Sequence, residues 1–221
     1  MTLKEAMKER HMVRKYTDRP LSEEAVTALN GRIAELNREH EIAMKLVTGN
    51  SDAFSAIIKL ILAKGVKNYI ILAGPDSSKL GEKLGYASAE LMLYAQTLGL
   101  NTWWVGGTFN RGVSSQVSAE NKVIGVVAIG YGVSQGAPHK SKSAKEVSSY
   151  KGDAPQWFTD GVEAALLAPT ALNKQPFMIS GDGNEVSISC DGGIFTGADL
   201  GLIKYHFELG AGKENFRWHH E

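Results

Sequence analysis

The sequence of 221 residues contains one cysteine, Cys190, which excludes an internal disulfide and a metal site built only from thiolates. The six histidines show no spacing typical of metal ligands, so we expect no metal. No apolar run approaches the roughly 18 residues that a membrane-spanning helix needs. Lys plus Arg and Asp plus Glu number 24 each, so no net charge favours nucleic acid or an anionic membrane. The charged N-terminal stretch does not look like a secretory leader, and these absences together predict a cytoplasmic protein without nucleic-acid or membrane partners.

The residues that are present are ordinary for a globular protein. Hydrophobic residues make up 43% and charged residues 22% of the chain, values that are wrong for a disordered protein. The length allows one large domain or two small ones that share a core. Charge is uneven only locally, because basic residues outnumber acidic ones in the first twenty positions.

Apolar spacing predicts a mixture of helices and strands in the first 150 residues. Ser22 is expected to cap a helix whose apolar stripe includes Leu29 and Ile33. A helix over 52–63 would present one apolar face, formed by Phe54, Ile57, Ile58, Ile61 and Leu62. The remaining predictions are a short helix over 2–10, a buried strand in "NYIILAGP", a long helix over 78–98 that ends at Gly99, strands buried on both faces in "NTWWVGG" and "KVIGVVAIGYG", and a surface connection over 134–153.

The second part of the chain is shorter and partly repeats the first. It is predicted to form a helix over 156–168, a hairpin of "PFMIS" and "EVSISC" around "GDGN", a helix over 197–209 and a last strand at "NFRW". Moving residues 87–99 forward by 111 positions places Ala87 on Ala198, Leu91 on Leu202, Tyr94 on Tyr205, Leu98 on Leu209 and Gly99 on Gly210. Two helices of similar spacing can also match by chance. A real duplication would let one chain build from its halves a site that otherwise needs two subunits.

Two segments in the first part have patterns that suit a ligand. "RHMVRKY" places Arg10 and Arg14 four residues apart, so a helical end would turn both guanidiniums, which suit phosphate, to one side. "WWVGGTFN" follows a buried strand with two glycines, which let the backbone approach a flat molecule. A solvated basic face and a simple turn are the alternatives for these two segments.

Two further segments lie later in the chain. "PHKSKSAKEV" would project Lys140 and Lys142 to the same side if it is extended, although it also reads as a solvated loop. "APTALNKQPF" holds Asn173 and Gln175 between two prolines, which fixes the positions of their amides. Such amides suit the polar edge of a flat heteroaromatic ring, and a purely structural turn is the alternative.

Together the four segments resemble the motifs of the FMN-dependent nitroreductase family, in particular its small members whose single chain mimics the usual two-subunit dimer. The family pattern R-[RH]-S-x-[RK]-x-[FY] is followed by Arg10, His11, Val13, Arg14 and Tyr16, with Met12 in place of the serine. "APTALNKQPF" follows A-P-S-x-x-N-x-Q-P-[WF], with Thr170 in place of the serine. "SAELMLYAQTLGLNTWWVGGTF" is similar to the family's central helix and the strand that leads to the flavin. "VVAIGYG" followed by "HKSKSAKEV" is similar to its closing strand and the basic pair that meets the phosphate.

The order of these motifs departs from the usual family pattern. In ordinary members the proline–asparagine turn follows the arginine motif closely, whereas here it comes about 155 residues later and "NGRIAELNREH" takes its place. In the usual dimer one subunit supplies the arginine motif, the glycine strand end and the basic pair, and the other supplies the turn. Here the first half lacks the turn and the second lacks the arginines. The resemblance, which leaves residues 30–68 poorly matched, therefore implies a single FMN site between two half-domains.

The resemblance implies an α+β fold with mostly antiparallel central sheets packed by helices. Its two half-domains, residues 1–150 and 151–221, would form an internal pseudo-dimer, so we expect a monomer, with further dimerisation left open. We expect no catalytic side chain, because no serine–histidine–acid or cysteine–histidine arrangement is evident. Gly106 or Gly107 would lie near flavin N5. The implied FMN-binding residues are Arg10, His11, Met12, Arg14, Gly106, Gly107, Lys140, Lys142, Pro169, Thr170, Ala171, Asn173 and Gln175.

The implied activity is that of an NAD(P)H oxidoreductase that uses FMN to reduce nitroaromatics, quinones or similar flat acceptors by ping-pong hydride transfer. Two alternatives stay open. Relatives with the same cofactor also dehalogenate, oxidise azoline rings or break down flavin. A degenerate flavin-binding or structural module without turnover is the other alternative, because Met12 replaces a serine that contacts the flavin.

Overall fold

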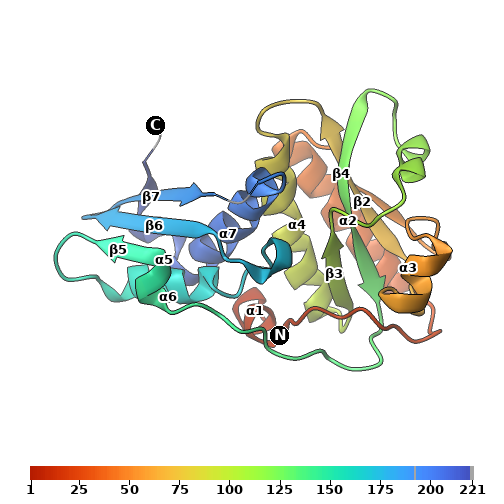
Figure 1. Ribbon diagram of the computed structural model, residues 1–221, viewed down its shortest axis with the longest axis horizontal. Helices are drawn as coiled ribbons and strands as arrows, with labels where there is room; N and C mark the ends of the chain where they lie inside the picture. Colours follow the sequence, from red (N-terminus) through yellow and green to blue (C-terminus); the bar gives the residue numbers. More distant parts are fainter. Residues whose placement is uncertain (192, 220–221) are drawn as a thin grey trace.

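The computed structural model describes residues 1–191 and 193–219, which form two four-stranded sheets. The sheets lie at opposite ends of an elongated molecule, and the helices α4 (Leu80–Thr97) and α7 (Thr196–Ala211) lie between them (Figure 1). One continuous apolar core extends from the first sheet through these helices to the second. This arrangement confirms the predicted α+β fold.

The first sheet is antiparallel throughout and is buried on both faces. Its strands, in spatial order, are β1 (Lys45–Val47), β2 (Tyr69–Pro75), β4 (Asn121–Gly130) and β3 (Asn101–Val105). Alternate residues of β2 point to opposite faces. Ile70 and Leu72 join the core that includes α1 (Leu3–Glu9), α2 (Glu23–His40) and α4, while Tyr69 and Ile71 join a second apolar cluster. Continuous apolar runs in the sequence had predicted this burial on both faces.

The second apolar cluster is covered differently from what the sequence predicted. The helix expected over 52–63 is reduced to α3 (Ala56–Ile61), whose Ile57 and Ile61 side chains are 69% and 66% exposed. Phe54 belongs to the turn that precedes this helix, and its side chain is buried. The predicted helix over 52–63 was too long, although Ile58 and Leu62 do pack against the cluster. Its start is delayed because the Asp52 N–H donates to Asn50 Oδ1 and the Ile58 N–H donates to Ser55 Oγ. The 3₁₀ segment η1 (Arg111–Gln116) covers part of the same cluster.

The second sheet combines one antiparallel and two parallel pairs. Its strands, in order, are β5 (Ser148–Tyr150), β6 (Phe177–Asp182), β7 (Glu185–Cys190) and β8 (Arg217–Trp218). The predicted hairpin is confirmed as β6 and β7, and the last strand as β8. The connection expected over 134–153 also contains α5 (Ala144–Val147) and β5, so it is not only a surface loop. The remaining elements are α6 (Gln156–Ala165), η2 (Ala171–Asn173) and η3 (Lys213–Asn215).

The helices α4 and α7 meet through their backbones at glycines. A Cβ atom on Gly85 would lie 2.1 Å from the Ala198 carbonyl oxygen, and one on Gly201 would lie 2.1 Å from the Glu82 carbonyl oxygen. No side chain fits in such a gap, so glycine is required at both positions. Beside this contact, Lys204 forms an ion pair with Glu82, and the Tyr86 hydroxyl donates a hydrogen bond to Glu208. The two sheets are thus joined through the contact of α4 with α7, in which the backbones lie close together and polar side chains lie at the edge. We call this contact the glycine seam.

Candidate functional site

The N-terminal segment reaches the first sheet at the edge of β3. Helix α1 begins with a capping box between Thr2 and Glu5 and ends at Glu9, because Arg10 is already extended with φ −72° and ψ 119°. Met12 then pairs with Thr102 as an isolated parallel bridge, and the Val13 N–H donates to the Thr102 carbonyl at 3.2 Å. The predicted helical end that would align Arg10 with Arg14 is absent, so the spacing argument for these two residues was wrong.

Arg10 is a buried cation that forms no ion pair with any residue that the structure describes. Its side chain is 5% exposed, its Nε has no hydrogen-bond partner among the described residues, and its charged neighbours include no carboxylate. Burial lowers the pKa of Arg10 to about 10. The guanidinium is therefore charged at neutral pH although the fold disfavours that charge, which is the condition expected of an anion-binding group.

His206 of α7 interacts with Arg10 but cannot neutralise it. The ring is fully buried, and its Nδ1 donates to the Leu202 carbonyl at 2.8 Å, which leaves Nε2 as an acceptor with no partner in residues 1–191 and 193–219. Burial, and next the Arg10 charge, lower the pKa of His206 to about 3. His206 is therefore neutral throughout the ordinary pH range and adds no second positive charge beside Arg10.

Arg14 lies elsewhere on the N-terminal segment. Its side chain is exposed, and its guanidinium carbon lies 5.0 Å from the centre of the Trp103 ring. His11 and Met12 contact the loop that leads to α5, since a Cβ atom on Gly136 would lie 2.8 Å from His11 Cβ and 2.9 Å from the Met12 carbonyl oxygen. The arginine motif and this loop are therefore neighbours, but Arg10 is buried whereas Arg14 is exposed.

The basic loop and the proline–asparagine turn are joined by hydrogen bonds. The Lys142 N–H donates to Gln175 Oε1 at 2.7 Å, and Lys142 Nζ donates to the Gln175 carbonyl at 2.9 Å. Asn173 Nδ2 donates to the Lys140 carbonyl at 2.7 Å. Gln175 is 1% exposed, and its Nε2 also donates to the Leu166 carbonyl at 2.8 Å, which fixes the amide orientation. The structure thus brings together two segments that the sequence separates by more than thirty residues.

The turn itself is held by bonds that the sequence did not reveal. Thr170 Oγ1 accepts from the Gln175 N–H at 3.0 Å, and the Ala171 N–H donates to both carboxylate oxygens of Asp199, at 2.9 and 3.1 Å. Asp199 belongs to the first turn of α7, where an acidic residue is common because it favours the helix dipole. Nothing in its sequence context indicates that it reaches back to Ala171, so this residue was missed.

The two glycines after β3 differ in their surroundings. Gly106 is covered by the ring of Phe195, since a Cβ atom on Gly106 would lie 2.3 Å from Phe195 Cε1. The same ring meets Trp104 edge-to-face, with centroids 6.0 Å apart. Gly107 is exposed. Phe195 was not predicted as a site residue, because an aromatic residue before a helix is usually part of the core.

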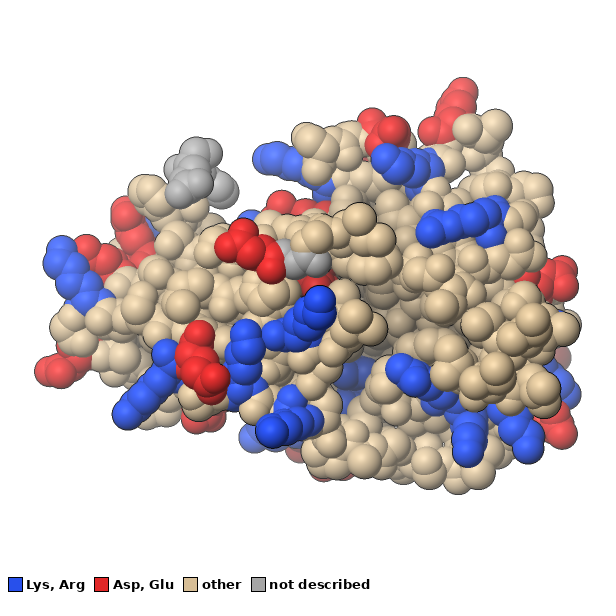
Figure 2. Space-filling view, in the orientation of Figure 1, with Lys and Arg blue, Asp and Glu red and all other residues tan. Residues whose placement is uncertain are grey.

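Basic side chains gather on one part of the face that Figure 2 shows. Figure 2 shows Lys and Arg side chains gathered across the middle of the face, over the loop before α5 and the turn after α6, beside a hollow between the two ends of the molecule. Lys140 and Lys142 of this loop and Lys174 of this turn are exposed. This part of the surface therefore favours an anionic ligand.

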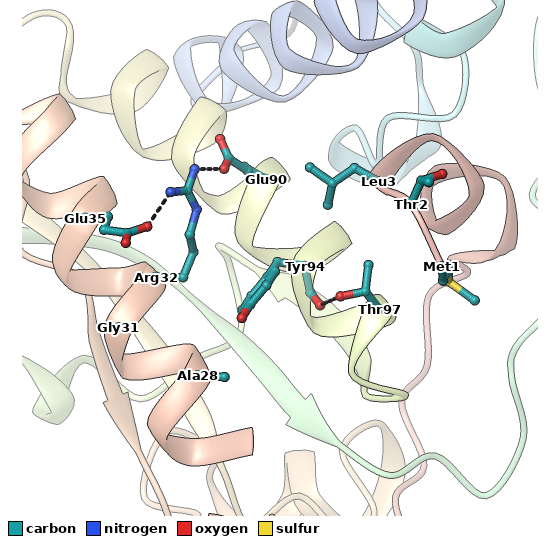
Figure 3. Close-up of a pocket in the computed structure, with 10 residues that line it drawn as sticks. All are labelled: Met1, Thr2, Leu3, Ala28, Gly31, Arg32, Glu35, Glu90, Tyr94 and Thr97. Carbon is teal, nitrogen blue, oxygen red and sulfur yellow. Dashed lines mark hydrogen bonds and ion pairs between the residues drawn. The ribbon is translucent and has the colours of Figure 1, made fainter. Parts of the chain in front are cut away.

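Two cavities lie away from these segments. One of about 600 Å³ lies between α1, α2 and α4, where Arg32 is paired with both Glu35 and Glu90 (Figure 3). Its one arginine is thus neutralised, and the cavity does not suit an anion. A second cavity of about 540 Å³ is lined by Arg19, which stacks on Tyr131 with a distance of 3.9 Å to the ring centre. Neither cavity contains any of the predicted site residues.

The described residues offer neither a metal cluster nor a membrane helix. Within 1–191 and 193–219, no group of three or more His, Cys, Asp or Glu side chains could hold a metal ion. No helix in the same residues is long and apolar enough to span a membrane.

The fold is that of the nitroreductases. A putative nitroreductase from Thermotoga maritima has a TM-score of 0.71 at 20% sequence identity, over 97% of this chain and 85% of that one. A putative nitroreductase from Desulfovibrio desulfuricans, in complex with FMN, has a TM-score of 0.55 at 17% identity, over 70% of this chain and 98% of that one. A putative NADH dehydrogenase/NAD(P)H nitroreductase from Parabacteroides distasonis has a TM-score of 0.52 at 20% identity, over 66% and 95% of the two chains.

The family model described as "Putative TM nitroreductase" matches residues 2–211. The chain therefore belongs to this nitroreductase family, which confirms the resemblance found in its motifs. No curated protein matches the chain.

Proposed function

We propose that this protein binds one FMN between its two halves and uses it as an NAD(P)H-dependent oxidoreductase of flat acceptors such as nitroaromatics and quinones. The observation that carries the proposal is the buried Arg10, which has a free Nε and no carboxylate neighbour. A phosphate monoester would supply the missing negative charge and the missing acceptor. The described residues thus fit the anionic end of FMN.

The other predicted residues have roles that follow from their positions. Lys140 would approach the phosphate from the exposed loop, whereas Lys142 already binds the turn through its ammonium group. Gly107 would present its backbone to the ring, since Phe195 covers Gly106. The turn from Pro169 to Gln175 would border the ring, as the family pattern implies. Met12, Thr170 and Ala171 remain predicted contacts, because the structure shows them only in bonds to the protein's own backbone and side chains.

Bound FMN would supply the redox chemistry, and this chain would bind and orient it and exclude water from one face. No protein nucleophile is required, in agreement with the lack of a suitable pair in the sequence. A nicotinamide and then an acceptor would use the same exposed face in turn, which predicts ping-pong kinetics. Because every proposed contact comes from one chain, the active form would be a monomer, and its reduced cysteine suits a cytoplasmic setting.

A flavin titration tests this function. Purified protein freed of ligand should take up FMN and regain the visible flavin spectrum. Under anaerobic conditions NADH or NADPH should bleach that spectrum, and a nitroaromatic or quinone should restore it. Protein that binds FMN but is not reduced by either nicotinamide would refute the proposed activity and leave a flavin-binding module. Protein that takes up no FMN at millimolar concentration would refute the cofactor as well.

A further inference from the structure

The turn over residues 169–176 has a conformation that its own residues do not favour. Leu172, Asn173 and Gln175 have φ angles of 53°, 54° and 47°, in the left-handed region that residues other than glycine seldom adopt. Leu172 is 88% exposed, so side-chain packing does not hold it there. A backbone of this kind persists only where its surroundings fix it.

Asp199 supplies a bond at the entry to this strained stretch. Both of its carboxylate oxygens accept from the N–H of Ala171, the residue directly before Leu172. Asp199 is 2% exposed and lies on α7, which packs closely against α4. The bond therefore connects a surface turn to helix α7 in the centre of the molecule.

The burial of Asp199 disfavours the charged form of its carboxyl group. Burial raises the pKa of Asp199 to about 6. On the strand side Asp199 acts on Cys190: burial and next Asp199 raise the pKa of that thiol to about 11, so it carries no charge at neutral pH. No described lysine, arginine or histidine forms an ion pair with Asp199. For folding alone a neutral asparagine of the same shape would be less costly, because it avoids the burial of a charge.

We propose that Asp199 is a positioning residue of the flavin site, which holds the Ala171 backbone so that the turn keeps the conformation in which it borders the ring. The proposal rests on the proposed function, since the turn is taken to border the flavin. A charged carboxylate holds an N–H group more strongly than a neutral acid does. The turn should therefore loosen when Asp199 gains a proton.

The sign of the pH effect on folding is opposite to the effect on binding. An acid whose pKa is higher in the folded than in the unfolded protein lowers stability as pH rises through the two values. For Asp199 that window extends from the ordinary aspartate range up to about 6. Asp199→Asn should therefore raise the melting temperature of the apo-protein at pH 7.5, and the gain should shrink near pH 5. A residue with a purely structural bond would instead lower the melting temperature when changed.

Riboflavin is the suitable ligand for the binding test, because it lacks the FMN phosphate, which itself titrates near pH 6. We expect its dissociation constant for the wild type to rise about fivefold from pH 7.5 to pH 5, as a charge-assisted bond becomes a neutral one. Asp199→Asn should show the weaker binding at both pH values. Asp199→Ala, which leaves the Ala171 N–H unpaired, should bind about tenfold or more weakly at pH 7.5.

Two variants serve as controls. Asp182→Asn removes a carboxylate that pairs with Lys151 on the exposed hairpin, and it should keep the wild-type pH dependence. His139→Gln removes an imidazole that contacts the Leu166 carbonyl and the Gln175 amide, and it should also keep that dependence. A pH effect that disappears in His139→Gln and persists in Asp199→Asn would overturn the proposal.

Amide hydrogen exchange of the apo-protein gives an outcome that does not depend on flavin. Over residues 166–177, exchange should be faster in Asp199→Ala and Asp199→Asn than in the wild type, while the sheets keep their protection. Unchanged exchange in both variants would show that Asp199 does not hold the turn. A wild type that binds neither riboflavin nor FMN would refute the proposed function, and the exchange result would still decide whether Asp199 fixes Ala171.

Discussion

Changing Arg10 to methionine should make the apo-protein more stable and its FMN complex weaker. Methionine keeps the apolar stem of the side chain and removes the buried charge. The depressed pKa of Arg10, about 10, corresponds to a burial penalty on the order of 3 kcal/mol. A base whose pKa is lower in the folded state reduces stability at every pH at which the unfolded form is protonated, which includes the whole neutral range. Since methionine cannot reproduce every contact of the stem, we expect a gain of about 1–3 kcal/mol in the free energy of unfolding.

The binding side of the same experiment has the opposite sign. If Arg10 bonds to the phosphate, its loss should remove about 1.5–3 kcal/mol of binding. FMN should then dissociate roughly ten- to a hundredfold more readily, and riboflavin should be nearly unaffected. Urea unfolding of the apo-protein and calorimetric titration with both flavins measure the two effects separately. Equal losses for FMN and riboflavin, or an apo-protein that becomes less stable, would refute the idea that Arg10 is poised for a phosphate.

The remaining predictions concern the number of sites, the second arginine, the turn and the glycine seam. Reconstituted protein should release close to one equivalent of FMN per chain on heating, and a value near two would contradict a site shared by two halves. Arg14→Met should weaken FMN binding less than Arg10→Met in the same titration, because Arg14 is exposed and its guanidinium lies over the Trp103 ring. An equal or larger loss of affinity would indicate that Arg14 contacts the phosphate. Asn173→Leu removes the bond to the Lys140 carbonyl and should weaken the binding of both FMN and riboflavin by about 0.5–1.5 kcal/mol. Unchanged binding, together with a lower melting temperature of the apo-protein, would show that Asn173 only stabilises its own turn. Gly201→Ala places a methyl group 2.1 Å from the Glu82 carbonyl oxygen and should cost about 1–3 kcal/mol in urea unfolding, while Gly31→Ala, where nothing lies within 4 Å, should not destabilise the protein.

Periodicity was sufficient to predict most of the fold. The helices that became α2 and α4 and the strands β2, β3 and β4 were predicted because each repeats its apolar residues at a regular spacing over many positions. Ser22 marked the start of α2, and its hydroxyl does accept the Ala25 N–H. The failures were short elements. The strand β1 has three residues and no alternation to detect, and α3 is shortened by local bonds of Asn50 and Ser55.

The candidate site was only partly visible in the sequence, because its bonds join distant residues. The motifs indicated Arg10, Lys142 and Gln175 by their type and order, and the structure places Lys142 and Gln175 in direct contact. The sequence did not indicate that Arg10 is buried while Arg14 is exposed, since that depends on where α1 ends. Asp199 could not have been found from its neighbours, because only the folded chain brings α7 against the turn.

The glycine seam between α4 and α7 joins two halves of one chain, which should make the proposed flavin site insensitive to dilution. A site assembled between two separate chains is lost when the protein concentration falls below the dissociation constant of the dimer. Here the arginine of the N-terminal segment, the basic loop and the turn held by α7 are covalently connected, so the partner segment is always present at a high effective concentration. Close backbone packing at Gly85 and Gly201 also holds α4 and α7 together. Flavin affinity should therefore be the same at nanomolar as at micromolar protein.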